Sequence, residues 1–298
     1  MSGEGRATVI IPTFDNGEPL RYALASAQAQ TVAELDIVVI GDGTTDATRE
    51  IVREAMATDD RVRFVDRPKG PRHGERYRHE VLQGARGEIV CYLCDDDLWV
   101  PGHVEEMARL LEDADFAHTG TLLVWGDGGL GTWLIDLADP TDRDRARTES
   151  HDLNLSAMGH RLDAYGRLPH GWRTTPRGFN TDHWMTRQFL EQPWVRAVSG
   201  TTVTNIHPAN SFWRDRTPAE KLEATRWFAA GLADPAWCRD ELPALVLAAH
   251  RNSWARTRAR ERRYRTSFER VTATRWWRAR ESVKSAVGRA RASRQRGG

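Results

Sequence analysis

Short apolar runs alternate with longer amphipathic segments in the first part of the chain, up to Leu111. Four runs have the length and composition of buried strands, at residues 7–12, 35–40, 61–65 and 89–93. The segments between and after them have helical composition or spacing, at residues 19–30, 45–56, 74–86 and 98–111, the last of which begins with a turn at Pro101. Short strands that alternate with longer helices indicate βαβ units and a largely parallel sheet. The pattern therefore predicts an α/β fold, with Thr44 or Thr45 as the N-cap of the second helix.

The periodicity weakens further along the chain. Residues 126–180 are dense in Gly, Asp, Arg and Pro, which is typical of functional loops or a flap rather than of core. Helical patterning returns at residues 184–190, 218–231 and 241–250. The chain contains no run of 18 apolar residues, so we expect no membrane-spanning helix.

The cysteines and the first residues bear on the compartment. Cys91, Cys94 and Cys238 are too few for a disulfide framework. Cys91 and Cys94 lie in a strand-like run without a second pair to complete a zinc site, so we interpret them as buried core residues. The start, Met-Ser-Gly-Glu-Gly-Arg, has no apolar segment of a secretory signal. We therefore expect a protein of the reducing cytoplasm.

The net charge of +1 conceals two different surfaces. Residues 251–298 contain 16 of the 43 Lys and Arg but 3 of the 42 Asp and Glu, which leaves residues 1–250 acidic. Arginines alternate with aromatic residues in this segment, and Tyr264, Phe268 and Val271 share one helical face. The composition predicts a body, residues 1–250, and a basic helical tail, residues 251–298. We expect this tail either to lie on an anionic membrane surface or to dock on the acidic body. Binding to nucleic acid is the least favoured alternative.

Three adjacent carboxylates, Asp95-Asp96-Asp97, follow the strand predicted at residues 89–93. Ligands bind at the carboxyl ends of strands in α/β sheets, and adjacent anions need a nearby cation. Oxygen ligands suit Mg²⁺ or Mn²⁺, which could carry a phosphate group. The triplet by itself fits either such a metal site or a solvated acidic turn.

Two further features lie where predicted strands end. Phe14 follows the first strand and could stack on a nucleotide base, with the backbone of Pro12 and Thr13 at the base edge; alternatively, it caps the core. Asp42 lies in the turn Gly41-Asp42-Gly43, which directs it outward as an acceptor for an imide N–H.

Two arginines, Arg76 and Arg78, lie near the start of the helix predicted at residues 74–86. The segment Arg76-Tyr-Arg-His79 could contact phosphate there, or it could form an ordinary solvated face.

In this order the features resemble the family-2 glycosyltransferases, which have the GT-A fold. The segment from Val9 to Thr31 matches their opening strand, Pro-Thr-aromatic turn and helix ending in Ala-Gln-Thr. Gly41 to Asp46 matches their Asp-Asp-Gly-Ser-Thr-Asp except at Gly41, and Ala85-Arg-Gly-Glu88 matches their strand entry. The resemblance covers about residues 7–110 strongly and 180–215 more weakly. It implies a Rossmann-like, mostly parallel central sheet flanked by helices, to which this chain adds its basic C-terminal tail.

The resemblance also implies roles for individual residues. Residues 1–120 would be the nucleotide-sugar-binding half and residues 121–250 the acceptor-binding half. The donor nucleotide would be held by Pro12, Thr13, Phe14 and Asp42 at the base, Arg78 near the base or diphosphate, and Asp95 at the ribose. The following Trp99-Val-Pro101 aligns Asp96 with the metal-binding position, for Mn²⁺ or Mg²⁺. Cys94 then stands where many members carry the first Asp of Asp-x-Asp, and Asp97 is left with a structural role.

Two residues of the second half complete the predicted site. Asp182, in Gly178-Phe-Asn-Thr-Asp-His-Trp184, matches the Asp of the family's Glu-Asp pair and is our candidate for the catalytic base; a helix cap is the alternative. His207, in Ile206-His-Pro, would bind the metal or the diphosphate, or is structural. Trp172 and Trp184 flank the base and are candidates for packing on sugar.

The sequence therefore predicts an inverting, metal-assisted glycosyltransferase that moves one sugar from a nucleotide diphosphate sugar to an acceptor hydroxyl. The acceptor would be a glycan, a lipid-linked molecule or a small molecule, with a role in polysaccharide biosynthesis. The enzyme would be cytoplasmic, or peripheral on the inner membrane face if the tail binds lipid. The alternatives are a nucleotidyltransferase of related fold and an inactive GT-A-like adaptor that binds membrane or nucleic acid through its tail.

Overall fold

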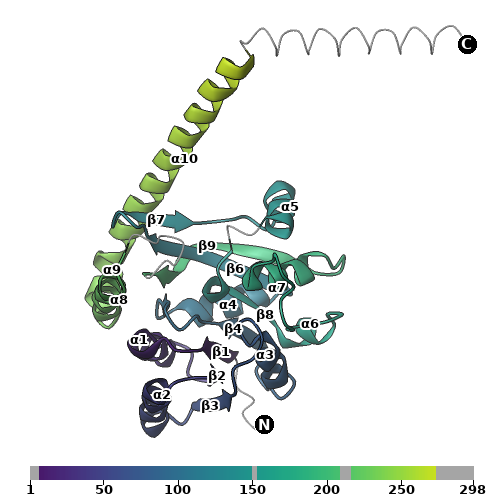
Figure 1. Ribbon diagram of the computed structural model, residues 1–298, viewed down its shortest axis with the longest axis vertical. Coiled ribbons are helices and arrows are strands. Elements are labelled where there is room, and N and C mark those ends of the chain that lie inside the picture. The colour runs from purple at the N-terminus through teal and green to yellow at the C-terminus, as the bar shows by residue number, and fades with distance from the viewer. Residues whose placement is uncertain (1–6, 150–152, 209–215, 273–298) are drawn as a thin grey trace, which may run out of the picture. The chain divides into compact units, whose positions relative to one another are not determined.

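The computed structural model describes residues 7–149, 153–208 and 216–272 (Figure 1). The chain divides into two compact units, with the boundary between His250 and Arg251. The first unit holds the sheet and the helices around it, and the second begins within the long helix α10 (Leu242–Thr272). Trp276 and Trp277 of the predicted tail lie outside the described residues.

Nine described strands form one sheet in the order β3-β2-β1-β4-β8-β6-β9-β5, with β7 paired to β6. The strands are β1 (Ala7–Thr13), β2 (Leu35–Asp42), β3 (Val62–Arg67), β4 (Ile89–Tyr92), β5 (Leu98–Trp99), β6 (Phe116–Val124), β7 (Leu130–Trp133), β8 (Met158–Arg161) and β9 (Ala197–His207). Strands β1 to β4, β6 and β9 run in one direction, and β5, β7 and β8 run against them. The predicted α/β fold with a mostly parallel sheet is confirmed.

Helices cover both faces of this sheet. They are α1 (Gly17–Gln28), α2 (Asp46–Thr58), α3 (Glu75–Leu82), α4 (His103–Leu111), α5 (Pro140–Thr148), α6 (Leu162–Gly166), α7 (Thr181–Leu190), α8 (Pro218–Leu232), α9 (Pro235–Asp240) and α10, with a short 3₁₀ turn η1 (Leu155–Ala157). Figure 1 shows α1 and α2 on one side of strands β1 to β3 and α3 on the other. None of the described helices is both long and apolar enough to cross a bilayer.

The alternation of side chains along the strands produces two separate cores. Val9 and Val39 pack with α1, α2 and α4 in one core. Ile10 and Val38 point to the opposite face and pack with α3, α6 and α7. A third, smaller cluster joins α8 and the start of α10 to strands β5, β6 and β9. Since strands β1 and β2 are buried on both faces, their apolar runs are nearly continuous, as expected for a parallel sheet.

The local predictions hold best in the first part of the chain. Thr45 is the N-cap of α2, and its side chain accepts a hydrogen bond from the Thr48 N–H. The prediction that residues 98–111 begin with a turn at Pro101 and continue as a helix is confirmed by α4, but the two residues Leu98 and Trp99 form the edge strand β5, which pairs with β9. The helix predicted at residues 241–250 is the beginning of the longer α10.

The prediction that residues 126–180 are loops rather than core is also wrong. Strand β8 inserts into the middle of the sheet, between β4 and β6. Tyr165 and Trp172 are 5% and 1% exposed and belong to the core around α3 and α7. Polar and glycine-rich composition concealed these contributions because each element is only a few residues long.

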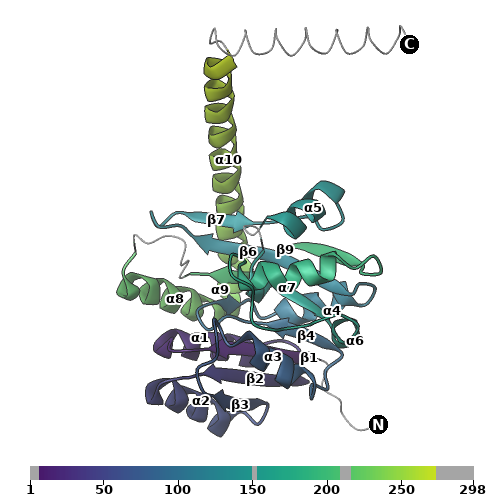
Figure 2. The same cartoon turned by 45° about the vertical axis from the view of Figure 1, so that its right-hand side comes forward.

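Sequence patterning gave no expectation for β6 and β9, the two long strands that run side by side (Figure 2). All residues of β6 are buried although four of them are His, Thr or Gly. Such a strand shows neither a clean alternation nor a continuous apolar run, which are the two patterns that identify strands.

Candidate functional site

A cavity of about 750 Å³ lies where strands β1, β2 and β4 end and helices α3 and α7 begin. Parallel strands end at the same edge of a sheet, so residues far apart in the sequence meet there. The predicted site residues that line the cavity are Pro12, Thr13, Phe14, Asp42, Arg78, Asp95, Asp96 and Asp182. His207, at the end of β9, is not among its lining residues.

The entrance of the cavity carries an exposed aromatic ring beside a buried carboxylate. Phe14 is 51% exposed, and Lys69 Nζ lies 5.3 Å from its ring centroid. Asp42 is 5% exposed, and its two oxygens accept hydrogen bonds from Lys69 Nζ at 2.6 Å and from the Gly70 N–H at 2.6 Å. A ring with a free face and a fixed carboxylate edge can hold a planar heterocycle.

A glycine makes this approach possible. Gly74 precedes α3 with φ of 61°, and a Cβ there would lie 2.6 Å from Cγ of Asp42. Glycine tolerates this left-handed conformation and has no Cβ that would collide with the Asp42 carboxylate.

Arg78, in the first turns of α3, projects a buried guanidinium into the cavity. The residue is 4% exposed, and its Nε and Nη1 atoms have no hydrogen-bond partner among the described residues. Burial lowers the pKa of Arg78, and the nearby Asp182 and Glu75 carboxylates oppose this effect. The guanidinium lies over the ring of Trp172, with Cζ 4.9 Å from its centroid. A buried cation with unused donors is suited to bind an oxyanion that enters the cavity.

Asp182 lies in the first turn of α7 and also lines the cavity. The N-cap of α7 is Asn180, whose side chain accepts from the Asp182 N–H at 2.9 Å. The carboxylate of Asp182 is therefore not needed as the cap. Burial raises its pKa to about 6, while Arg78 and a backbone hydrogen bond from Leu155 act in the opposite direction. A carboxylate with this pKa is ionised near neutral pH and can accept a proton.

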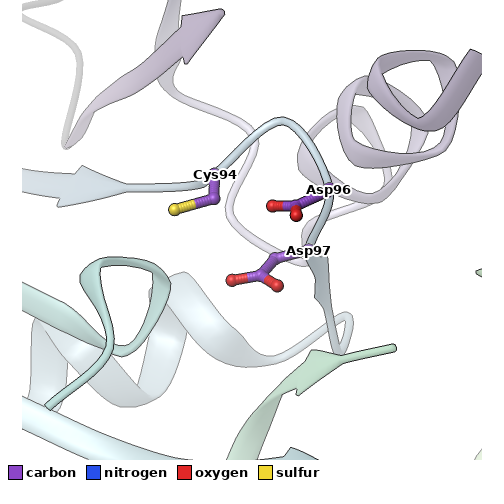
Figure 3. Close-up of side chains that lie close together, drawn as sticks. All are labelled: Cys94, Asp96 and Asp97. Atoms are coloured by element: carbon purple, nitrogen blue, oxygen red, sulfur yellow. The ribbon is translucent and has the colours of Figure 1, made fainter. Parts of the chain in front are cut away.

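The acidic turn after β4 contributes three different carboxylates. Asp95 accepts a hydrogen bond from Asn16 Nδ2 at 3.0 Å, and burial raises its pKa. Burial and the neighbouring Asp97 raise the pKa of Asp96 to about 7. Figure 3 shows Asp96, Asp97 and Cys94 converging on one space. One ligand atom from each lies within 4.8 Å of the others.

Asp97 is fully buried and is the most firmly held of the three. Its Oδ2 accepts hydrogen bonds from Ser156 Oγ at 2.5 Å and from Asn154 Nδ2 at 3.2 Å, and its Oδ1 contacts His207 Nδ1. Burial disfavours the charged form of His207, but the adjacent Asp97 outweighs this effect and raises the pKa of His207 to about 9. His207 thus lies beside the acidic turn through Asp97, and its ring stacks on Trp133 at 6.2 Å between centroids.

The donor set of this turn fits a divalent cation. Asp96, which is partly buried, and Asp97, which is fully buried, supply hard oxygen ligands, and Asp95 adds a third carboxylate beside them. Carboxylates brought this close stabilise a dication and repel one another without one.

Two aromatic residues and one cysteine differ from expectation in their surroundings. Trp172 is buried, donating from Nε1 to Tyr92 Oη at 2.8 Å, and is part of the core rather than a sugar platform. Trp184 is half-buried against Phe179. Cys91 is a core residue as predicted, but Cys94 is only partly buried and lines the cavity.

Several residues of the site escaped the sequence analysis. Lys69 holds Asp42, and Glu75 joins α3 to α7 by accepting from Thr181 Oγ1 at 3.2 Å. Ser156 and Asn154 support Asp97 from η1. Their partners lie 27 to 106 positions away along the chain, so no local pattern could identify them. The segment Lys69-Gly-Pro-Arg72 was the available signal, since glycine and a basic residue before a helix often mark an anion site.

Comparison with known proteins places these features in a family. The model of the family "Glycosyl transferase family 2" matches residues 8–162. A GalNAc(5)-diNAcBac-PP-undecaprenol beta-1,3-glucosyltransferase from Campylobacter jejuni is 29% identical over 126 residues, which cover 42% of this chain and 40% of that enzyme. The chain thus matches less than half the length of this curated relative.

Solved structures agree on the fold. Residues 1–349 of Staphylococcus aureus TarS in complex with UDP-GlcNAc match 76% of this chain and 66% of that one, with a TM-score of 0.53 and 17% identity. The mannosyltransferase PcManGT from Pyrobaculum calidifontis, in complex with GDP-Man and Mn²⁺, matches 95% of this chain and 85% of its own, with a TM-score of 0.50 and 15% identity. The predicted GT-A fold is confirmed, and with the family model covering more than half of its residues, the chain belongs to glycosyl transferase family 2.

Proposed function

We propose that the protein is an inverting glycosyltransferase that moves a single sugar from a nucleotide diphosphate sugar to an acceptor hydroxyl. Donor binding would involve mainly residues within 1–120, including Arg78, together with Asp182 on the wall of the cavity. The acceptor would be bound by part of residues 121–250. The two solved structures of similar fold named above are complexes with UDP-GlcNAc and with GDP-Man, which supports this substrate class.

The observation that carries the proposal is the unused guanidinium of Arg78. It is buried, it has two nitrogens without partners among the described residues, and it lies in one cavity with the exposed ring of Phe14 and the carboxylate of Asp182. A nucleotide diphosphate supplies a planar base for Phe14 and anionic oxygens for Arg78. Ligands that combine a planar base with phosphate groups satisfy both residues at once.

In the proposed reaction Asp182 removes the proton of the acceptor hydroxyl as its oxygen bonds to the anomeric carbon of the donor. The bond between that carbon and the diphosphate oxygen breaks, and the leaving nucleoside diphosphate keeps the electron pair. Arg78 stabilises the charge that develops on the diphosphate. Attack and departure occur on opposite faces of the sugar, so the configuration at that carbon inverts.

The proposed cation, Mn²⁺ or Mg²⁺, would be held by Asp96 and Asp97, with His207 beside Asp97. When bound, it would neutralise negative charge on the diphosphate. Asp95 would accept a hydrogen bond from the ribose while Asn16 fixes its orientation.

A panel of UDP-, GDP- and dTDP-sugars tests this proposal. The matching donor, at a hundred times its Kd and with Mn²⁺ present, should stabilise the protein by about 2.7 kcal/mol, or roughly 5–10 °C in Tm. It should also be hydrolysed slowly in the absence of acceptor. If no donor changes the Tm or is hydrolysed, the transferase proposal fails. Release of pyrophosphate from a nucleoside triphosphate and a sugar phosphate would favour the nucleotidyltransferase instead.

We further propose that the acceptor is lipid-linked and that residues 251–298 bring the enzyme to an anionic membrane. The name of the Campylobacter relative includes a polyprenyl diphosphate carrier, which supports a lipid-linked acceptor. Residues 251–272 carry eight Arg against two Glu, and Trp254 and Tyr264 are 60% and 61% exposed. Each arginine near an anionic surface contributes roughly 1 kcal/mol, and exposed aromatic rings anchor at the interface.

Flotation with phosphatidylglycerol vesicles tests the membrane proposal. The full chain should bind them at low salt, bind neutral phosphatidylcholine vesicles much more weakly, and lose binding when residues 251–298 are deleted. Equal binding by the truncated protein would remove the membrane role. Tight binding of the full chain to duplex DNA but not to vesicles would favour the nucleic-acid alternative.

A further inference from the structure

We propose that Cys94 is a ligand of the cation at the acidic turn, so that the cation site contains sulfur and favours a thiophilic divalent ion over Mg²⁺. The inference rests on the proposed function for the presence of the site, but it concerns a residue of this chain that departs from the family pattern. It is tested by metal binding alone, without any transfer reaction.

The geometry brings the sulfur to the cation position. Cys94 Sγ and one carboxylate oxygen each of Asp96 and Asp97 lie within 4.8 Å of one another (Figure 3). Ligand atoms bound to one ion at about 2.0–2.3 Å lie closer together than this, so the side chains need to turn toward one another for all three to bind. Cys94 also lines the cavity, which gives an ion a path from solvent.

Hydrogen bonds hold the backbone that carries the sulfur and the carboxylate beside it. The Cys94 N–H donates to Ser156 Oγ at 2.9 Å, and the same hydroxyl donates to Asp97 at 2.5 Å. One serine thus orients both ends of the ligand set. Asp97 cannot turn away without breaking this contact and that with Asn154.

The charges around the turn call for a dication. Asp95, Asp96 and Asp182 line the same cavity as Cys94, and Asp97 lies beside them at the acidic turn. These carboxylates repel one another, and a divalent ion between them relieves that repulsion. Ion binding releases the thiol proton of Cys94 to solvent, as it does at other thiolate sites.

The presence of sulfur decides which ion is favoured. Thiolate ligands select Zn²⁺, Co²⁺ or Cd²⁺ and tolerate Mn²⁺, whereas Mg²⁺ requires oxygen ligands in nearly ideal octahedral geometry. An aspartate at position 94 would make the site hard and open to Mg²⁺. The cysteine in its place therefore changes ion preference while leaving the cavity otherwise the same.

Titration of the full-length, metal-free protein with Co²⁺ tests the inference by absorbance. We expect one equivalent of Co²⁺ to produce a thiolate-to-cobalt charge-transfer band in the near ultraviolet. Cys94→Ser should lose the band, and Cys238→Ser, which changes the other partly buried cysteine, should keep it. For Cys94→Asp we expect the ratio of the affinities for Mn²⁺ and Mg²⁺ to fall by more than about tenfold. A change of this size exceeds the smallest effect of altering a residue that only supports a ligand.

Three results would overturn the inference: a wild-type protein that binds Co²⁺ calorimetrically without the band, a Cys94→Ser variant that retains it, or a protein that binds no Co²⁺. The donor panel separates this failure from that of the proposed function. A wild-type protein that responds to a nucleotide sugar but shows no sulfur band refutes the cysteine ligand and leaves the transferase intact.

Discussion

Replacement of Arg78 by methionine should stabilise the ligand-free protein and weaken binding of the nucleotide diphosphate. Arg78 Nε and Nη1 are buried without hydrogen-bond partners among the described residues. Each such donor costs about 1–3 kcal/mol, so the two together cost about 2–6 kcal/mol. Methionine removes both donors and preserves an apolar contact with Trp172.

Two interactions reduce this gain. The guanidinium lies 4.9 Å from the centroid of the Trp172 ring, a contact worth about 0.5–2 kcal/mol. The attraction of Asp182 and Glu75 is also lost. We therefore expect Arg78→Met to raise the free energy of unfolding by about 1–3 kcal/mol, which corresponds to a rise in Tm of about 2–10 °C.

Differential scanning fluorimetry without ligand and calorimetric titration with UDP or GDP measure the two effects. Loss of a buried charged contact should weaken binding by about 2–5 kcal/mol, or roughly 30- to 5000-fold. The matched control is Arg76→Met, two residues upstream on the exposed side of α3, which should change neither quantity beyond about 0.5 kcal/mol. A lower Tm for ligand-free Arg78→Met would refute the cost assigned to the unpaired donors. Unchanged nucleotide affinity would refute its role at the diphosphate.

The remaining predictions concern the base, the stacking ring and one backbone contact. Asp182→Asn should keep donor affinity but lower turnover by about 10²- to 10⁴-fold; normal turnover would exclude it as the base. Because burial raises the pKa of Asp182 to about 6, kcat/KM of the wild type should fall about tenfold per pH unit below that value as the carboxylate becomes protonated. Phe14→Ala should weaken donor binding by about 1–3 kcal/mol in calorimetry and leave Tm unchanged, since the ring is 51% exposed. Gly87→Ala should destabilise the fold by about 1–3 kcal/mol in urea unfolding, because its Cβ would lie 2.5 Å from the Thr8 nitrogen; Gly84→Ala, with nothing nearer than 3.8 Å, should cost little.

The part of the site that the sequence predicted consists of residues immediately after strands. Phe14, Asp42 and Asp95 each follow an apolar run, and the rule that parallel strands end at one edge is enough to bring them together. The same rule located the nucleotide half of the fold, because β1, β2 and β4 are buried on both faces and have unmistakable apolar sequences.

The rest depends on contacts that no local pattern records. The role of Asp97 is set by Ser156 and Asn154, which lie 59 and 57 positions further along the chain. These residues belong to a segment whose composition is that of a loop. Lys69 likewise becomes part of the site only because the chain after β3 returns to Asp42. Polar groups that act in pairs across the fold can be recognised only once the fold has brought them together.

The structure also gives a physical reason for the glycine at position 41, where the family pattern has an aspartate. Gly41 pairs with Asp66 across β2 and β3, and a Cβ at position 41 would lie 2.9 Å from Oδ1 of Asp66 and 3.0 Å from the ring of Phe64. That Asp66 carboxylate accepts hydrogen bonds from Thr44 Oγ1 at 3.2 Å and from Arg49 Nε at 2.8 Å. A carboxylate is thus present at the end of β2, but the neighbouring strand supplies it, and the glycine provides the space it needs. The departure changes which strand carries the negative charge beside this turn, and Asp42 keeps its place in the cavity.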